Sequence, residues 1–140
     1  SSWSGVSGFE RIRYQSITEG GSDLGSLSNP IVISGFPYSD SRNTLNAPSD
    51  LLDACGAVPG TDESGREFVY AFDVQQPGHL RATVADGLGV DIDLHLYRDV
   101  AERDCIARHD DLLEFDLNTC GRHFLVLDTY VNTSGQELAG

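Results

Sequence analysis

The most regular alternation of apolar and polar residues in this sequence runs through residues 89–97, GVDIDLHLY. Its apolar face consists of Ile92, Leu94 and Leu96, and its polar face of Asp91, Asp93, His95 and Tyr97. A period of two residues predicts a β-strand with one buried face. Aspartate is disfavoured in strands. The two aspartates therefore raise three alternatives: they bind a metal, they hold a loop, or they face water.

The same alternation predicts further strands on both sides of this one. They cover residues 31–33, 67–74, 79–85, 105–107, 112–117 and 122–128, and no strand is expected after them. Turns rich in glycine and proline, such as QQPG and DGLG, separate them. Short strands at this spacing indicate an all-β fold, with residues 67–97 as a three-strand meander and no βαβ unit.

The first 28 residues differ in composition from the rest of the chain. They are rich in serine and glycine, which predicts a linker or an N-terminal arm over residues 1–28. A short strand within residues 9–17, FERIRYQSI, is the alternative for part of this segment. Residues 29–140 are expected to form the folded domain.

The composition limits the kinds of partner that this chain can bind. Its 140 residues suffice for one domain with a hydrophobic core. The chain has 22 acidic residues and 9 basic ones, all arginine, and a formal charge of −13. This charge argues against binding to nucleic acid or to an anionic membrane surface. No apolar run is long enough to span a bilayer.

Residues 39–55, SDSRNTLNAPSDLLDAC, carry many short side chains with oxygen atoms. They are Asp40, Asn43, Thr44, Asn46, Asp50 and Asp53. Such side chains form turns by hydrogen bonding to nearby backbone. They also match the six to eight oxygen ligands of calcium. The DxDxDG calcium loop is absent, so both interpretations stay open.

The sequence lacks the motifs of the common hydrolases. Neither GxSxG nor HExxH is present. His95 and His123 would meet only if their strands were neighbours, in which case they and Asp93 would suit a transition metal. The carboxylates suitable for glycoside hydrolysis are Glu67, Asp91, Asp93 and Asp128. Nothing places two of them across a cleft, so no enzyme and no catalytic residue is predicted.

The three cysteines are Cys55, Cys105 and Cys120, and none lies in a CxxC pair. One disulfide and one free thiol are the simplest arrangement. The spacing alone does not choose between Cys105–Cys120, which closes a short loop, and Cys55–Cys105, which joins distant segments.

Several blocks of the sequence together resemble the bacterial pre-peptidase C-terminal domain. These blocks are NPIVISGFPYSDSRNT, Cys55, TDESGREFVYAFDV, PGHLRATV, DIDLHLY, Cys105 and CGRHFLVLDTY. The resemblance implies an antiparallel β-sandwich of jelly-roll type over residues 29–140. It also implies secretion as an accessory module beside peptidases and other hydrolases. It places Tyr70, Asp93, Leu94 and Leu96 in the best-marked strands, and Gly121 in the turn before the last long strand.

The sequence departs from the family pattern at two places. The family usually has an aromatic residue in place of His123 and often a proline in place of Cys120. The resemblance therefore implies that Cys120 is the free thiol and that Cys55 and Cys105 form the disulfide. The family also commonly ends in a strand Gly-x-Tyr-x-Leu-x-Val, which would begin near Gly140. We therefore expect a sandwich without its last strand, with the sequence truncated or with the edge filled by the N-terminal arm or by another chain.

Calcium is the one cofactor that the resemblance suggests. Some collagen-binding relatives of similar fold hold calcium near the N-terminal linker and the loops. By position in the fold, the candidate ligands are first Asp40, Asn43, Asp50 and Asp53, and then Asp91 and Asp93. No matched motif supports this assignment.

The resemblance leads to an expected function. We expect a non-catalytic, secreted or cell-surface bacterial module. It would bind an extracellular polymer, either a protein fibre or a glycan, or would pack beside an adjacent hydrolase domain. The alternative is a self-assembling surface or filament subunit that is completed by strand donation at a sheet edge.

Overall fold

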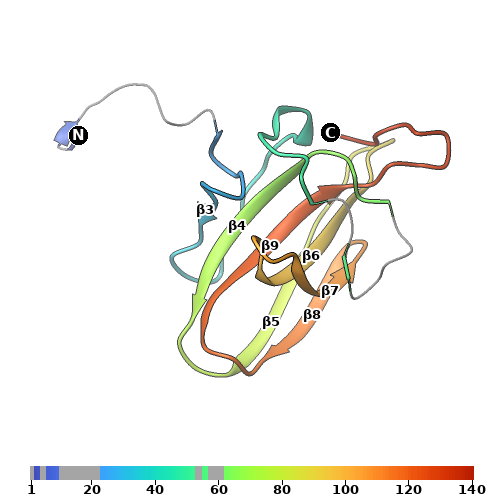
Figure 1. The fold of residues 1–140 in the computed structure, drawn as a ribbon. Helices are drawn as coiled ribbons and strands as arrows, with labels where there is room; N and C mark the ends of the chain where they lie inside the picture. The colour runs from blue at the N-terminus through green and yellow to red at the C-terminus, as the bar shows by residue number, and fades with distance from the viewer. Residues whose placement is uncertain (1, 4–5, 10–22, 53–54, 57–61) are drawn as a thin grey trace.

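The computed structural model describes residues 2–3, 6–9, 23–52, 55–56 and 62–140. Two short strands, β1 (Ser2–Trp3) and β2 (Val6–Phe9), pair with each other in parallel. The remaining elements are β3 (Ile31–Val32), the 3-10 turn η2 (Thr44–Asn46), β4 (Glu67–Val74), β5 (Gly78–Thr83), β6 (Ile92–Asp99), β7 (Asp104–His109), β8 (Leu112–Leu117) and β9 (Gly121–Thr129). The fold is all-β, as the sequence predicts (Figure 1). The strand predicted within residues 9–17 lies almost wholly outside the described residues.

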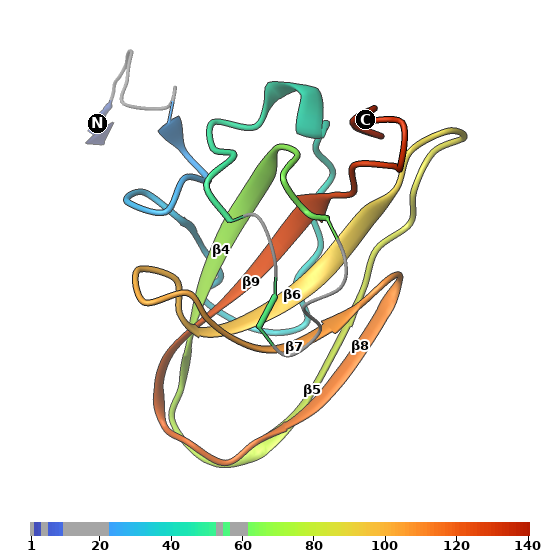
Figure 2. The same ribbon diagram turned by 45° about the vertical axis from the view of Figure 1, so that its right-hand side comes forward.

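The strands from β3 onward form two layers of unequal size. The larger sheet has the order β3-β4-β9-β6-β7, and β5 and β8 pair as a separate sheet (Figures 1 and 2). Every pair in these two sheets is antiparallel except β3 with β4. The antiparallel sandwich expected from the sequence is therefore present, whereas its jelly-roll type stays a prediction.

The prediction of a meander over residues 67–97 is wrong. β4 and β6 both belong to the larger sheet, but β9 lies between them, and β5 belongs to the other layer. The turn after Val74 therefore carries the chain across the sandwich instead of back along the same sheet. Each strand's alternation shows which residues share a face, but it carries no information about which strand lies beside it.

The apolar face of the larger sheet packs against the β5–β8 layer. The buried residues of this core are Ile31, Ile33, Phe68, Tyr70, Phe72, Leu80, Leu94, Leu96, Leu113 and Leu117. The apolar positions predicted for residues 89–97, which include Ile92, are thus buried as expected. Burial of a large apolar side chain contributes roughly 1.5–3 kcal/mol, so this core is the main source of stability.

The opposite face of the larger sheet is also buried, which the sequence pattern does not predict. A second apolar cluster lies there, made of Leu52, Cys55, Val69, Tyr97, Val100, Cys105 and Val126. Leu52 and Cys55 come from the segment before β4, which covers this face. The polar side chains of β6 therefore lie inside the protein.

The part of the chain that the structure describes contains no helix with the length and hydropathy of a transmembrane segment.

Candidate functional site

The polar face of β6 lies in a buried ionic cluster, which we define as Glu63, Asp93, His95, Arg108 and Asp128. Glu63 precedes β4, Asp93 and His95 belong to β6, Arg108 to β7 and Asp128 to β9. The side chains of Glu63, His95 and Asp128 are fully buried, and that of Asp93 is 1% exposed. Burial of charged groups is costly unless they are paired or neutralised. The interactions inside the cluster therefore decide its charge.

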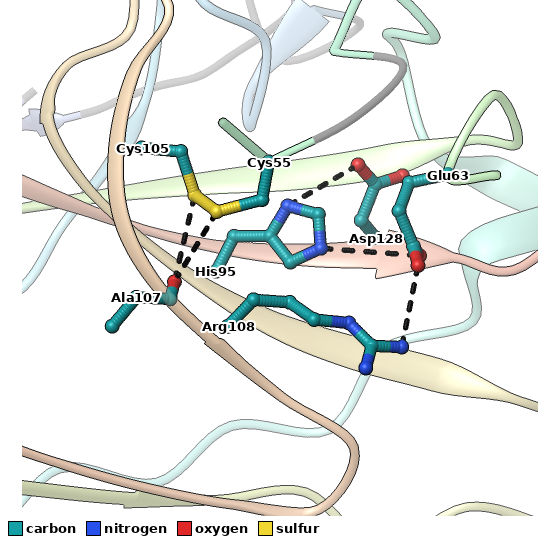
Figure 3. Close-up of a disulfide and its surroundings, with 7 residues drawn as sticks. All are labelled: Cys55, Glu63, His95, Cys105, Ala107, Arg108 and Asp128. Carbon is teal, nitrogen blue, oxygen red and sulfur yellow. Dashed lines mark hydrogen bonds and ion pairs between the residues drawn. A yellow bond between two sulfur atoms is a disulfide. The ribbon is translucent and has the colours of Figure 1, made fainter. Parts of the chain in front are cut away.

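A disulfide fastens the covering segment beside this cluster. It joins Cys55 to Cys105 on β7 (Figure 3). The carbonyl oxygen of Ala107 lies 3.7 Å from the sulfur of Cys55 and 3.5 Å from that of Cys105. This is the pairing that the family resemblance implies, and it is confirmed. Cys120 is the free cysteine and is exposed.

The position of Glu63 is fixed by backbone contacts on both sides of it. The N–H of Val131 donates to the carbonyl of Asp62 at 3.0 Å, and the N–H of Gly65 donates to the carbonyl of Thr129 at 3.3 Å. A Cβ atom at Gly65 would lie 2.7 Å from the Thr129 carbonyl oxygen. Only glycine allows this close approach. The carboxyl group of Glu63 is thereby directed over the sheet.

Arg108 is the only cation among the five residues of the cluster. Its Nη2 atom contacts the carboxylate of Asp93 and lies 3.3 Å from Oε2 of Glu63. Its Nη1 atom lies 3.0 Å from the exposed carboxylate of Asp110. A guanidinium with several N–H groups suits such a shared position. One cation, whose side chain is only 15% exposed, thus serves two buried carboxyl groups.

His95 lies between two further carboxyl groups. Its Nε2 atom is 3.9 Å from Oε1 of Glu63, and its Nδ1 atom is 3.8 Å from Oδ2 of Asp128 (Figure 3). Both distances exceed those of a hydrogen bond. Among the described residues, neither ring nitrogen has a hydrogen-bond partner. His95 is therefore held by packing and burial in a polar site.

Glu67, at the start of β4, ties the covering segment to the sheet in a different way. Its carboxylate accepts hydrogen bonds from the Ser49 hydroxyl, from Leu51 N at 3.0 Å and from Leu52 N at 3.1 Å. These donors stabilise a carboxylate charge. Burial nevertheless raises the pKa of Glu67 above its ordinary value. Glu67 thus has a structural function beside the cluster.

The electrostatics of the cluster favour neutral forms. Burial raises the pKa of Glu63 to about 9, and the adjacent Asp93 adds to this shift. Burial, followed by the nearby Glu67 and Glu63, raises the pKa of Asp128 well above its ordinary value. Burial and then the charge of Arg108 lower the pKa of His95 to about 3. Burial also raises the pKa of Asp93. At neutral pH, His95 is therefore neutral, and the pair of Glu63 and Asp93 beside Arg108 holds a proton.

The oxygen-rich connection before β4 uses its side chains to form turns. Asp40 accepts hydrogen bonds from Ser41 N, Arg42 Nε and the Tyr70 hydroxyl, at 2.9, 2.6 and 3.0 Å. The side chain of Asn43 caps η2 by accepting from Leu45 N at 2.9 Å. These contacts match the turn-forming interpretation.

The other predicted calcium ligands are dispersed. Asp50 is exposed, and Asp53 lies outside the described residues. Asp91 lies before β6, where its backbone bonds to Leu138 and Tyr130. Asp93 is buried, and Arg108 contacts the Oδ2 atom of its carboxylate. Within the described ranges, no three His, Cys, Asp or Glu residues are placed to hold a metal. Calcium binding by the six residues named from the sequence stays a prediction.

His95 and His123 do not meet, because they point to opposite faces of the larger sheet. His95 lies opposite Val126 in the β6–β9 register, and His123 lies opposite Phe72 in the β4–β9 register. The His123 ring stacks on Phe72 with a centroid distance of 6.0 Å. A shared transition-metal site for the two histidines is therefore ruled out by the alternation of β9.

The sequence interpretation missed Glu63 and Arg108 as partners of Asp93. Glu63 lies in a segment rich in glycine, and Arg108 lies in a highly charged stretch that reads as a loop. One feature of the sequence indicates that such partners exist. Two aspartates and a histidine on a central strand need partners if that strand is covered on both faces.

A second candidate site lies at the β3 side of the sandwich. We define the aromatic edge as Phe36 and Tyr38, whose exposed fractions are 59% and 40%. Phe36 makes an edge-to-face contact with Phe72 at 5.7 Å, and Tyr38 makes one with Tyr70 at 6.1 Å. The two exposed rings are thus supported by core residues of β4.

Comparisons with known proteins give no match for this chain, neither to a family model, nor to a curated protein, nor to a solved structure. The resemblance to the pre-peptidase C-terminal domain therefore stays a prediction.

Proposed function

We propose that this chain is a non-catalytic extracellular accessory module that binds a polymer through its aromatic edge. The observation that carries this proposal is the exposure of Phe36 and Tyr38 on a supported backbone. Aromatic side chains dominate the energetics of binding surfaces because they bury much area with few rotatable bonds. Contiguous exposed apolar groups mark interaction sites more often than scattered ones do.

Three further features support this proposal. The Cys55–Cys105 disulfide is compatible with an oxidising, extracellular location. Asp93, His95 and Asp128, which the sequence offers for chemistry, are buried inside the cluster instead of lining an open surface. The resemblance to a secreted accessory domain agrees with both observations. The class of polymer, protein fibre or glycan, is left for the binding experiment to decide.

The double variant Phe36→Ala/Tyr38→Ala is expected to lose polymer binding. Co-sedimentation with insoluble protein fibres and with insoluble glycans measures the dissociation constant. We expect the double variant to bind at least about tenfold more weakly, which corresponds to a loss of about 1.4 kcal/mol. Leu88→Ala is the matched control, because Leu88 is fully exposed in the β5–β6 connection. The proposal fails if the wild type binds no polymer or if the double variant binds like the control.

The second candidate function is self-assembly through sheet edges. Among the described strands, β5 and β8 each have a single neighbour, and β3 covers the edge of β4 over two residues only. Exposed edges of this kind accept an added strand. Size-exclusion chromatography at two protein concentrations tests this function. Self-assembly predicts large, concentration-dependent species, whereas the accessory module predicts one monomeric peak at both concentrations.

A further inference from the structure

The buried ionic cluster has too few cations for its carboxyl groups. Glu63, Asp93 and Asp128 bring three carboxyl groups into a site where Arg108 is the fixed cation. With all three ionised and His95 neutral, the site would hold two uncompensated negative charges. A buried charge without a partner is strongly disfavoured, and the group takes up a proton instead.

The unpartnered atoms of the cluster indicate where such protons can reside. The buried oxygen atoms Glu63 Oε1, Asp93 Oδ1 and Asp128 Oδ2 have no hydrogen-bond partner among the described residues. The same holds for both ring nitrogens of His95. Glu63 and Asp93 moreover share one guanidinium group. A proton between or beside these oxygens removes excess charge without moving the backbone.

We propose that the buried ionic cluster is a proton-binding site, which the folded chain keeps protonated at neutral pH and which makes the protein most stable in mildly acidic medium. This inference goes beyond the proposed polymer binding and does not depend on it.

Charged and titratable groups from all surrounding elements act on this site. They are Glu67 on β4, Asp91 before β6, Asp93, His95 and Tyr97 on β6, Arg103 before β7, Arg108 on β7, Asp110 after β7 and Asp128 on β9. Carboxylates outnumber arginines in this set, so the surroundings increase the tendency of Glu63 to hold a proton. The proton affinity is thus a property of the whole assembly.

The direction of the pH dependence follows from the pKa shifts. Glu63 has its pKa raised to about 9 in the folded chain, against about 4.3 when unfolded. Its contribution to stability is therefore full below about pH 4.3 and is lost as the pH rises towards about 9. Asp128, whose pKa is also raised, acts in the same direction.

His95 opposes this effect only at lower pH. Its pKa falls to about 3 on folding, from about 6.5 in an unfolded chain. The folded protein therefore loses stability from His95 as the pH falls below about 6.5. Between about pH 6.5 and about pH 9, the carboxyl groups of the cluster should make the stability fall as the pH rises. The exposed His79, whose pKa is raised by its hydrogen bond to Asp116, acts in the same direction above about pH 6.5, so the comparison of variants isolates the effect of Glu63.

Urea unfolding from about pH 6.5 to about pH 9 tests this proposal. We expect the free energy of unfolding of the wild type to decrease across this range. Glu63→Gln keeps a neutral side chain at every pH. Its free energy of unfolding should therefore fall less steeply with pH than that of the wild type, by the slope that corresponds to about one proton bound on folding. Glu102→Gln is the control, because Glu102 is exposed, and it should keep the wild-type slope.

Two further measurements keep the test independent of the folding of one variant. Asp128→Asn should likewise reduce the slope. Unfolding of the wild type near neutral pH in weak buffer should release protons, which a pH electrode detects. Constant or rising wild-type stability over this range overturns the proposal. Equal slopes for Glu63→Gln and Glu102→Gln, or proton uptake on unfolding, overturn it as well.

Discussion

Removal of the Cys55–Cys105 disulfide is expected to lower the free energy of unfolding by about 4 kcal/mol. The bond joins residues 50 positions apart, and cross-links that close long loops restrict the unfolded chain most. Such a loss is a large part of the stability of a domain of this size. Urea unfolding of the double variant Cys55→Ala/Cys105→Ala, compared with the wild type under oxidising conditions, measures the effect.

Cys120→Ala is the matched control for this experiment. Cys120 is exposed and forms no disulfide, so its replacement should change the stability by less than about 0.5 kcal/mol. A reducing agent should destabilise the wild type and this control equally, without effect on the double variant. Equal stability of all three proteins in oxidising buffer would contradict the structural importance of the bond.

Replacement of Arg108 by methionine is expected to cost about 3–5 kcal/mol. The change leaves the buried carboxylate of Asp93 without its cation. Addition of Asp93→Asn removes the orphaned charge, so the double variant should be more stable than Arg108→Met alone. Unfolding of both single variants and the double variant near neutral pH gives the interaction energy between the two residues.

Arg98→Met supplies the comparison on the surface. Arg98 lies 3.4 Å from Asp104, and both side chains are about half exposed. A pair of this kind contributes between about 0 and 1 kcal/mol. Additive effects of Arg108→Met and Asp93→Asn would show that the two side chains act independently, contrary to the buried contact.

The alternation of side chains predicts the strands of this protein well but not their neighbours. The predicted strands at residues 67–74 and 112–117 coincide with β4 and β8. The predicted strand 122–128 differs from β9 by one residue at each end. The period of a strand is a local property of the sequence. Pairing depends on contacts between distant segments, and for this reason the meander was wrong.

The alternation of residues also does not predict whether the polar face of β6 is buried or exposed. Asp93, His95 and Tyr97 alternate with apolar residues as in a solvated strand, yet all three are buried. The segment that covers them contains Leu52 and Cys55, which precede β6 by many residues. Of the three alternatives for the aspartates, Asp93 matches the second, because it helps hold the segment before β4 through Arg108 and Glu63.

The cysteine pairing shows what a family resemblance adds to a single sequence. Spacing left Cys105–Cys120 and Cys55–Cys105 equally open. The family pattern at Cys120 favoured the second, and the structure has this bond. For the short polar residues Asp40 and Asn43, by contrast, no family motif helps to choose between two interpretations. Turn formation and calcium binding require the same side chains, so composition does not separate the two.

The position of β9 between β4 and β6 has a consequence for the order of folding. β4 bonds to β9 along its whole length, and residues 75–120 lie between the two strands. The central sheet therefore does not form on the ribosome until almost all of β9 has been synthesised. Folds dominated by such distant contacts form slowly. Until then, the apolar strand EFVYAFDV lacks its β9 partner, and strands with an unpaired edge of this kind are prone to aggregation.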